Sequence, residues 1–108
     1  MVKQSWGELR WFTSAAQGNS ATNTTGQATI SVGQEAPPHY HPNCDEILRV
    51  VRGEVRETIG DKIYVLSAGD IVSIPKGIRH GSKNIGGEDA VLALSYSSAY
   101  RLTVGETP

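Results

Sequence analysis

The sequence predicts an all-β domain, an antiparallel sandwich or barrel, on three observations. Short segments alternate polar with apolar residues, and turn signals separate them at intervals of roughly 8–12 residues. Glycine accounts for 12 of the 108 residues, and serine and threonine are frequent, as is typical of turn-rich β proteins. No stretch carries the apolar stripe of an amphipathic helix. A chain of this length suits one hydrophobic core, so residues 1–108 are expected to form a single domain.

The N-terminal part is predicted to be an arm and a loop, residues 1–27, and the predicted barrel spans residues 28–104. The arm carries both tryptophans of the chain, Trp6 and Trp11. These side chains are expected to pack either on the core of the domain or on a partner subunit. Residues 14–29 are mostly small and polar and lack periodicity, which indicates a loop or weak strand edges.

The barrel strands are predicted from apolar or alternating runs that turn residues bound. Gly60 and Asp61 form a two-residue hairpin signal between two such runs. Pro37 and Pro38 do not fit a central strand, so the chain is expected to turn there. The predicted strands are residues 28–33, 39–42, 47–51, 55–59, 62–66, 71–74, 78–82, 90–96 and 100–104. Closing such a sheet removes its exposed edges, and a barrel this small has room inside for one ion and one small ligand.

One stretch of the chain concentrates groups that can bind a metal. His39 and His41 are two residues apart, so in an extended strand they point to one face with Cβ atoms roughly 7 Å apart. Two imidazoles at that spacing can converge on one ion at about 2.1 Å from each nitrogen. Glu46 can add an anionic oxygen from the next strand, and His80 can complete the set from a third. These are all the histidines of the chain.

Three neighbours of these residues have other interpretations. Asp45 competes with Glu46 as the acidic ligand, and the alternation of the strand leaves that choice open. Cys44 is interpreted as a small loop residue, because a reactive thiol needs a lowered pKa that the sequence does not indicate. Tyr40 lies between two candidate ligands in a strand, so its side chain is expected to face away from the metal.

The spacing of these residues resembles the two sequence motifs of the cupin family. The first motif, G-x5-H-x-H-x(3–4)-E-x6-G, is matched by Gly33, His39, His41, Glu46 and Gly53. The second motif, G-x5-P-x-G-x2-H-x3-N, is matched by Gly69, Pro75, Gly77, His80 and Asn84. Every spacing of both motifs is kept. The short segment between the motifs resembles the small single-domain microbial members.

The resemblance implies a double-stranded β-helix, or jelly-roll barrel, whose metal ligands are His39, His41, Glu46 and His80. Three imidazoles and one carboxylate suit one divalent first-row transition metal, and Mn, Fe, Ni, Zn, Co and Cu are all compatible with that set. Four protein ligands leave one or two positions open on a five- or six-coordinate ion. An exogenous small molecule can therefore bind the ion directly.

Two functions from different classes agree with these features. The first is a metal-dependent enzyme acting on a small oxygenated molecule, such as a sugar acid, keto acid or phenolic. Its chemistry would be that of a Lewis-acid isomerase, lyase or cyclase, or a dioxygenation. The alternative is a non-catalytic module that binds or senses a small sugar-like molecule. The intact ligand set favours the enzyme, because by the resemblance purely structural cupins often lose these ligands.

Few residues suggest themselves as substrate contacts. Tyr96 and Ser98 follow the last buried strand and can line the barrel mouth, and Tyr96 is the predicted contact. Three arginines can pair with a carboxylate, although exposed arginine is the commoner case: Arg52, Arg56 and Arg79. The sequence indicates no second general acid or base, because every histidine is assigned to the metal.

Composition restricts the partners and the location. The net charge is −1 and no basic run exists, which excludes nucleic acid as a partner. The apolar runs are far shorter than the ~20 residues that span a bilayer, and no signal-peptide pattern opens the chain. A single cysteine permits no internal disulfide, which fits a reducing compartment. We therefore expect a cytoplasmic protein, and the cupin resemblance together with the aromatic arm implies a homodimer.

Overall fold

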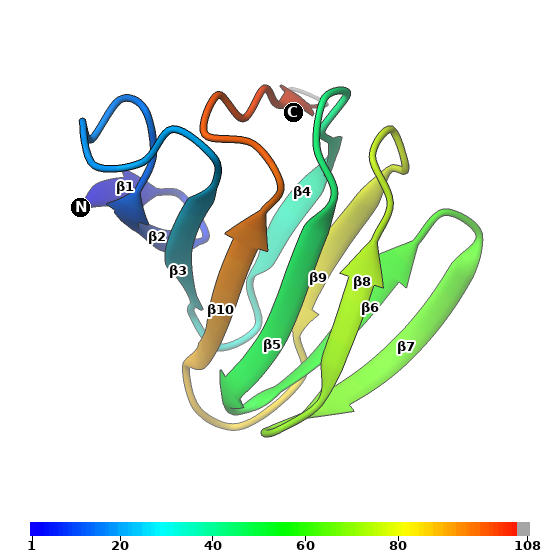
Figure 1. Cartoon of the computed structure of the whole chain (residues 1–108). Coiled ribbons are helices and arrows are strands. Elements are labelled where there is room, and N and C mark those ends of the chain that lie inside the picture. Colours follow the sequence, from blue (N-terminus) through cyan, green and yellow to red (C-terminus); the bar gives the residue numbers. More distant parts are fainter. Residues whose placement is uncertain (106–108) are drawn as a thin grey trace.

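Two antiparallel sheets face each other in the computed structural model, which describes residues 1–105 (Figure 1). One sheet has six strands in the order β1-β2-β3-β10-β5-β8, and the other has five in the order β11-β4-β9-β6-β7. The strands are β1 (Val2–Gln4), β2 (Gly7–Thr13), β3 (Thr24–Ile30), β4 (Glu35–Tyr40), β5 (Glu46–Arg52), β6 (Glu54–Ile59), β7 (Lys62–Ser67), β8 (Ile71–Ile74), β9 (His80–Asn84), β10 (Ala90–Tyr96) and β11 (Val104–Gly105). The described residues contain no helix, so none is available there to cross a membrane. The all-β, jelly-roll prediction is confirmed.

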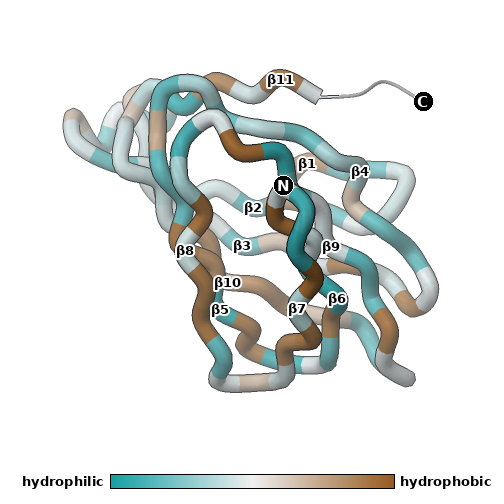
Figure 2. Tube along the Cα trace, turned by 90° about the vertical axis from the view of Figure 1, so that its right-hand side faces the viewer, coloured by the Kyte–Doolittle hydropathy of each residue, from teal (hydrophilic) through white to brown (hydrophobic). Residues whose placement is uncertain are grey.

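The core lies between the two sheets and comes mostly from β3, β5 and β10. Their residues alternate between buried and more exposed positions, as the period of two of a strand requires. Leu48, Val50 and Leu92 are at most 2% exposed, and Val55 of β6 faces them from the other sheet. Figure 2 shows hydrophobic stretches gathered along β5, β8 and β10. Each large side chain removed from water contributes about 1.5–3 kcal/mol to folding.

The N-terminal segment belongs to the six-stranded sheet. Strands β1 and β2 form an antiparallel hairpin, and β2 pairs with β3 along most of its length. Trp6, Leu9 and Trp11 pack against the core. The arm therefore packs on its own domain, which is one of the two roles expected for it. The prediction of a loop or weak strand edges for residues 14–29 is wrong from Thr24 onward, where β3 begins as an inner strand of the sheet. The pairing of β3 with β2 and β10 satisfies its backbone groups on both edges, which outweighs its polar composition.

The two prolines lie inside a strand and not at the predicted turn. Pro37 and Pro38 are part of β4, and the chain turns before them, at Gly33 with φ 74°. The register between β4 and β9 shifts between Ala36 and His39, so the prolines occupy the interruption in the hydrogen-bond ladder. Proline is tolerated there because its missing N–H removes no ladder bond.

Two motif residues have structural roles. Gly53 adopts φ 87° between β5 and β6, and a Cβ there would lie 3.0 Å from the Cα of Ala90, so no other residue fits this bend without strain. The Asn84 side chain is 1% exposed and donates to the carbonyl oxygens of Ile30 and Glu88 at 2.9 and 2.8 Å. Both residues hold the connections that bring the strands carrying the candidate ligands into register.

Candidate metal centre

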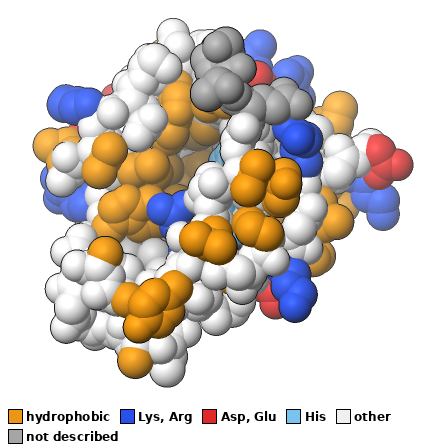
Figure 3. All heavy atoms as spheres, turned by 90° about the horizontal axis from the view of Figure 1, so that it is seen from above, with side chains coloured by type: hydrophobic (Ala, Val, Ile, Leu, Met, Phe, Trp, Pro, Cys, Tyr) orange, Lys and Arg blue, Asp and Glu red, His pale blue; other side chains and the backbone are white. Residues whose placement is uncertain are grey.

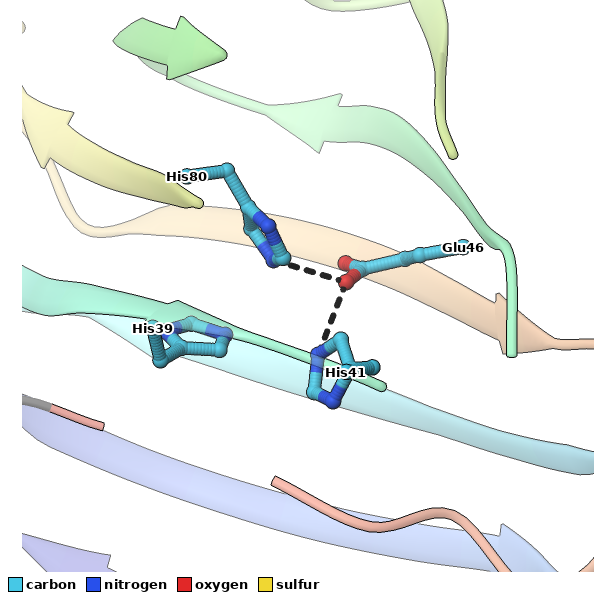
Figure 4. A group of neighbouring side chains, drawn as sticks. All are labelled: His39, His41, Glu46 and His80. Atoms are coloured by element: carbon cyan, nitrogen blue, oxygen red, sulfur yellow. Dashed lines mark ion pairs between the residues drawn. The ribbon is translucent and has the colours of Figure 1, made fainter. Parts of the chain in front are cut away.

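The structure brings together all four residues predicted as metal ligands (Figure 4). His39 lies in β4 directly opposite His80, the first residue of β9, while His41 follows β4. Glu46 is the first residue of β5 and reaches the three imidazoles from the opposite sheet. One ligand atom from each residue lies within 4.8 Å of those of the others. His41, Glu46 and His80 are buried, whereas His39 is half-buried.

Each of the three imidazoles is oriented by a backbone carbonyl group next to its Nδ1 atom. The Nδ1 atoms of His39, His41 and His80 lie 2.8, 2.9 and 2.9 Å from the carbonyl oxygens of Pro37, Leu102 and Ile78. A carbonyl oxygen only accepts, so each Nδ1 carries the proton and donates it. In each neutral imidazole the Nε2 atom is therefore the one available to a metal, which is the arrangement that metal-binding histidines adopt.

The groups facing the centre of the site lack satisfied partners. Oε1 of Glu46 lies 3.2 Å from Nε2 of His41 and 3.0 Å from Nε2 of His80. None of these three buried atoms makes a well-oriented hydrogen bond with the described residues. Buried lone pairs that face one another are unfavourable unless a cation or a proton lies between them. The set of donors and its geometry fit one divalent transition metal ion.

The protonation states also suit a metal. Burial lowers the pKa of His39 to about 4, so its imidazole is neutral at physiological pH. Burial by itself would raise the pKa of Glu46, but the adjacent His41 and His80 side chains outweigh it and lower that pKa to about 2. Burial lowers the pKa of His80, whereas the neighbouring Glu46 carboxylate raises it. The effect of the carboxylate is larger, so the pKa of His80 is raised overall. A cation bound at Nε2 would replace the proton that Glu46 favours on His80.

Of the two neighbouring carboxylates, the one that the motif spacing indicates lies with the imidazoles. Glu46 is 3% exposed and faces the imidazoles, whereas Asp45 is exposed and accepts a hydrogen bond from the backbone N–H of Lys76 at 2.9 Å. Cys44 is 1% exposed, and burial raises the pKa of its thiol, which agrees with its interpretation as an unreactive packing residue.

The three arginines considered from sequence lie away from the site. Arg52 pairs with Glu88 on the surface, at 3.3 Å between Nη2 and Oε2. The guanidinium of Arg79 lies 5.9 Å from the centre of the Tyr40 ring. Neither these two arginines nor Arg56 lines the cavity beside the metal group.

A cavity of about 380 Å³ lies between the sheets, and the four candidate ligands form part of its wall. Figure 3 shows the hollow with hydrophobic side chains around it, a histidine inside and a basic side chain close by. Most of the remaining wall is apolar, including Trp6, Leu9, Trp11, Leu48 and Leu92. This size and lining are typical of small-molecule sites.

Tyr96 lies in the cavity wall as the sequence predicts. Its ring centre is 4.9 Å from that of His41, and it pairs across the strands with Glu46. Burial raises the pKa of Tyr96 well above 10, so the phenol keeps its proton. Ser98 is not part of the wall, and its carbonyl oxygen accepts a hydrogen bond from the Thr24 hydroxyl.

Sequence reasoning missed a buried acid beside the cavity. Glu57 in β6 is 0% exposed, and Ser82 of β9, which lines the cavity, donates its hydroxyl proton to Oε1 of Glu57. Oε2 of Glu57 has no partner among the described residues. Burial raises the pKa of Glu57 to about 8, so this carboxyl group is largely protonated at neutral pH. The alternation of β6 was the available signal, because Glu57 occupies the same face as the core residue Val55.

The chain belongs to the cupin family: the family model of the cupin domain matches residues 26–96. Among curated proteins, oxalate oxidase 1 of Hordeum vulgare is 35% identical over 89 residues, which cover 71% of this chain and 44% of that protein. Polyketide synthase CurC of Streptomyces cyaneus is 28% identical over 91 residues, which cover 84% of this chain and 59% of that protein. The chain thus spans about half the length of these relatives.

Solved structures agree with the family. An oxalate oxidase in complex with the substrate analogue glycolate superposes with a TM-score of 0.85 at 25% identity, over 95% of this chain and 56% of that one. An oxalate decarboxylase superposes with a TM-score of 0.89 at 23% identity, over 96% of this chain and 29% of that one, and shows the fold.

Because the pKa of Glu57 is raised in the folded protein, we predict that this residue lowers the free energy of unfolding as the pH rises. Its folded pKa of about 8 lies above the ordinary 4.5, so its contribution is fully present below pH 4.5 and is lost as the pH approaches 8. The loss is at most about 1.4 kcal/mol per pH unit. Because Glu57→Gln removes this titration, the stability of the variant relative to wild type should rise between about pH 5 and pH 8.

Chemical denaturation of the metal-free proteins measures this difference. Glu35→Gln, at an exposed position of β4, is the matched control and should show no such trend. A difference between Glu57→Gln and wild type that did not vary with pH would contradict the prediction.

Proposed function

We propose that this protein is a metal-dependent cupin enzyme that acts on a small oxygenated organic molecule. His39, His41, Glu46 and His80 would hold one divalent ion, drawn from Mn, Fe, Ni, Zn, Co and Cu. The observation that carries the proposal is the position of the group: its unsatisfied donor atoms belong to the wall of a cavity large enough for a small molecule. A purely structural metal would instead be enclosed by its ligands.

The chemistry of the site divides between the ion and the chain. A bound divalent ion supplies a Lewis acid that polarises an oxygen of the substrate or, for a redox-active metal, a place where dioxygen binds. The three bonds from Nδ1 to backbone carbonyls hold the imidazoles in place. The apolar wall excludes water and strengthens every electrostatic contact within it. The phenol of Tyr96 remains a hydrogen-bond donor toward a bound oxygen.

A proton source is also present. The neutral Glu57 holds a proton behind Ser82, and the Ser82 hydroxyl lies in the cavity wall. A pKa of about 8 lets this carboxyl group give or take a proton near neutral pH. This pair supports proton-transfer chemistry of the isomerase, lyase or cyclase type, on a sugar acid, keto acid or phenolic. Relatives named for oxalate oxidation support a small organic acid as the substrate class, and dioxygenation remains the other reaction type.

The ligand assignment predicts the metal content. Wild-type protein purified without chelators should carry about one divalent ion per chain, and the double variant His39→Ala/His80→Ala should lose most of it, because two of four ligands are gone. Glu46→Gln should also bind metal more weakly, while Glu35→Gln, which is exposed on β4, should match wild type. Elemental analysis measures the metal, and full occupancy in the double variant would refute the assignment.

The enzyme hypothesis predicts that a small-molecule ligand raises Tm only when the metal is bound. A screen of small carboxylates, diols and phenolics should raise Tm of the holo protein by several degrees, since saturation at about 100-fold over Kd stabilises by about 2.7 kcal/mol. The increment should vanish in the apo protein, and the ligands should be converted in a turnover assay. Equal stabilisation of apo and holo protein, with no turnover, would instead support the non-catalytic binding or sensing module.

Assembly and location remain predictions. Because Trp6 and Trp11 pack within the domain, we place the homodimer contact at the two edge strands β7 and β8, where Ile63, Val65 and Ile71 are 64%, 62% and 60% exposed. Light scattering should give twice the 11.6 kDa of one chain, and Val65→Lys should shift the mass toward the monomer, because a charge on an edge strand opposes pairing.

A monomer mass across micromolar concentrations would contradict the dimer, and Val32→Lys at another exposed valine is the control. The single buried, free cysteine supports a cytoplasmic location, and the net charge of −1 supports the absence of a nucleic-acid partner.

A further inference from the structure

Arg101 is a cation in the wall of the cavity that the sequence motifs do not include. It follows β10 in the C-terminal segment and is half-buried. Its guanidinium carbon lies 4.3 Å from the ring centre of Trp11 and 5.2 Å from that of Tyr96. Two aromatic faces hold the guanidinium in one orientation and favour its charge.

The polar contacts of Arg101 leave one edge of its guanidinium for a ligand. Nη1 donates to the hydroxyl of Thr103, while Nε is buried and has no hydrogen-bond partner among residues 1–105. No carboxylate of the described chain forms an ion pair with Arg101, in contrast to Arg52, which pairs with Glu88 on the surface. A buried donor on a charged group is unfavourable when it is unpaired, so the Nε and Nη2 edge is placed for an acceptor.

The guanidinium is close to the metal group. Thr103, which accepts the bond from Arg101, also has its hydroxyl oxygen 3.2 Å from Nδ1 of His41. Tyr96 contacts both the ring of His41 and the guanidinium of Arg101. One bridging residue therefore separates the cation from a candidate metal ligand, so a single small molecule can contact both.

We propose that Arg101 determines the substrate class: the cavity binds a carboxylate with an apolar body and a second oxygen next to the carboxylate, as in an aryl or branched aliphatic 2-oxo or 2-hydroxy acid. The planar carboxylate accepts two hydrogen bonds from the Nε and Nη2 edge of Arg101. The apolar body of the acid lies against Leu9, Leu48 and Leu92 in the cavity wall. An acid that has no apolar body would leave these three side chains uncovered. The second oxygen faces the metal group, and only this part rests on the proposed function.

The family match does not account for this feature. It covers residues 26–96 and contains all four candidate ligands, whereas Arg101, Thr103 and Trp11 lie outside it. Of the residues that shape the anion contact, Arg101, Thr103 and Trp11 thus belong to the flanks of this chain, while Tyr96 is the last residue of the match.

Binding of phenylpyruvate, its methyl ester and inorganic phosphate tests the proposal by calorimetry on the full chain, with and without metal. Wild type should bind the acid at least 10-fold more tightly than the ester, and Arg101→Gln should lose roughly 10- to 100-fold in affinity for the acid alone. Arg101→Lys should recover part of this loss, because it keeps the charge without the two-pronged edge. Arg52→Gln, which changes an exposed arginine, should match wild type.

The outcomes separate this proposal from the metal-dependent enzyme. Equal affinities of wild type for acid and ester would overturn it without any variant, as would an Arg101→Gln protein of unchanged Tm and metal content that bound the acid normally. Phosphate binding as tight as that of the acid would overturn the carboxylate assignment. Loss of acid affinity in Arg101→Gln without any effect of metal or any turnover would support the anion contact and reject the proposed function.

Discussion

The hydrogen bonds from three imidazole Nδ1 atoms to backbone carbonyls are the interactions on which this site depends. Two of them are local, since His39 and His80 each donate to the residue two positions earlier. The third is not: His41 donates to Leu102, from the C-terminal segment. That segment therefore orients a candidate metal ligand and also carries Arg101 into the cavity wall. The metal group and the wall that faces it are coupled through one short stretch of chain.

Two buried glutamates illustrate how surroundings set the chemistry of identical groups. Glu46 faces two imidazoles, and their attraction outweighs the cost of burying its charge. For Glu57, burial and the nearby charge of Glu46 raise the pKa and outweigh the hydrogen bond from Ser82, so the group remains largely protonated near neutral pH. One carboxyl group is thereby suited to holding a cation and the other to holding a proton, a division of roles that acid–base sites require.

The cupin match contains the metal group but only part of the cavity wall. The cupin match ends at Tyr96 and begins after the N-terminal hairpin, and every candidate metal ligand lies within it. Trp6, Trp11 and Arg101 come from outside the match, yet all three line the cavity. Under the proposed function, the matched frame would hold the metal and the flanking segments of this chain would contribute to selectivity, since one fold can carry different chemistries.

The sequence by itself determined the β class, the jelly-roll assignment and the set of candidate ligands. Strand alternation and fixed motif spacings are local properties, so they can be read along the chain. Only the tertiary structure decided that Pro37 and Pro38 lie in a strand and that Thr24 begins one, because pairing with neighbouring strands overrides local preference. It also placed Arg101 in the cavity wall, one bridging residue away from His41. Those outcomes depend on contacts between residues far apart in the chain, which no local pattern records.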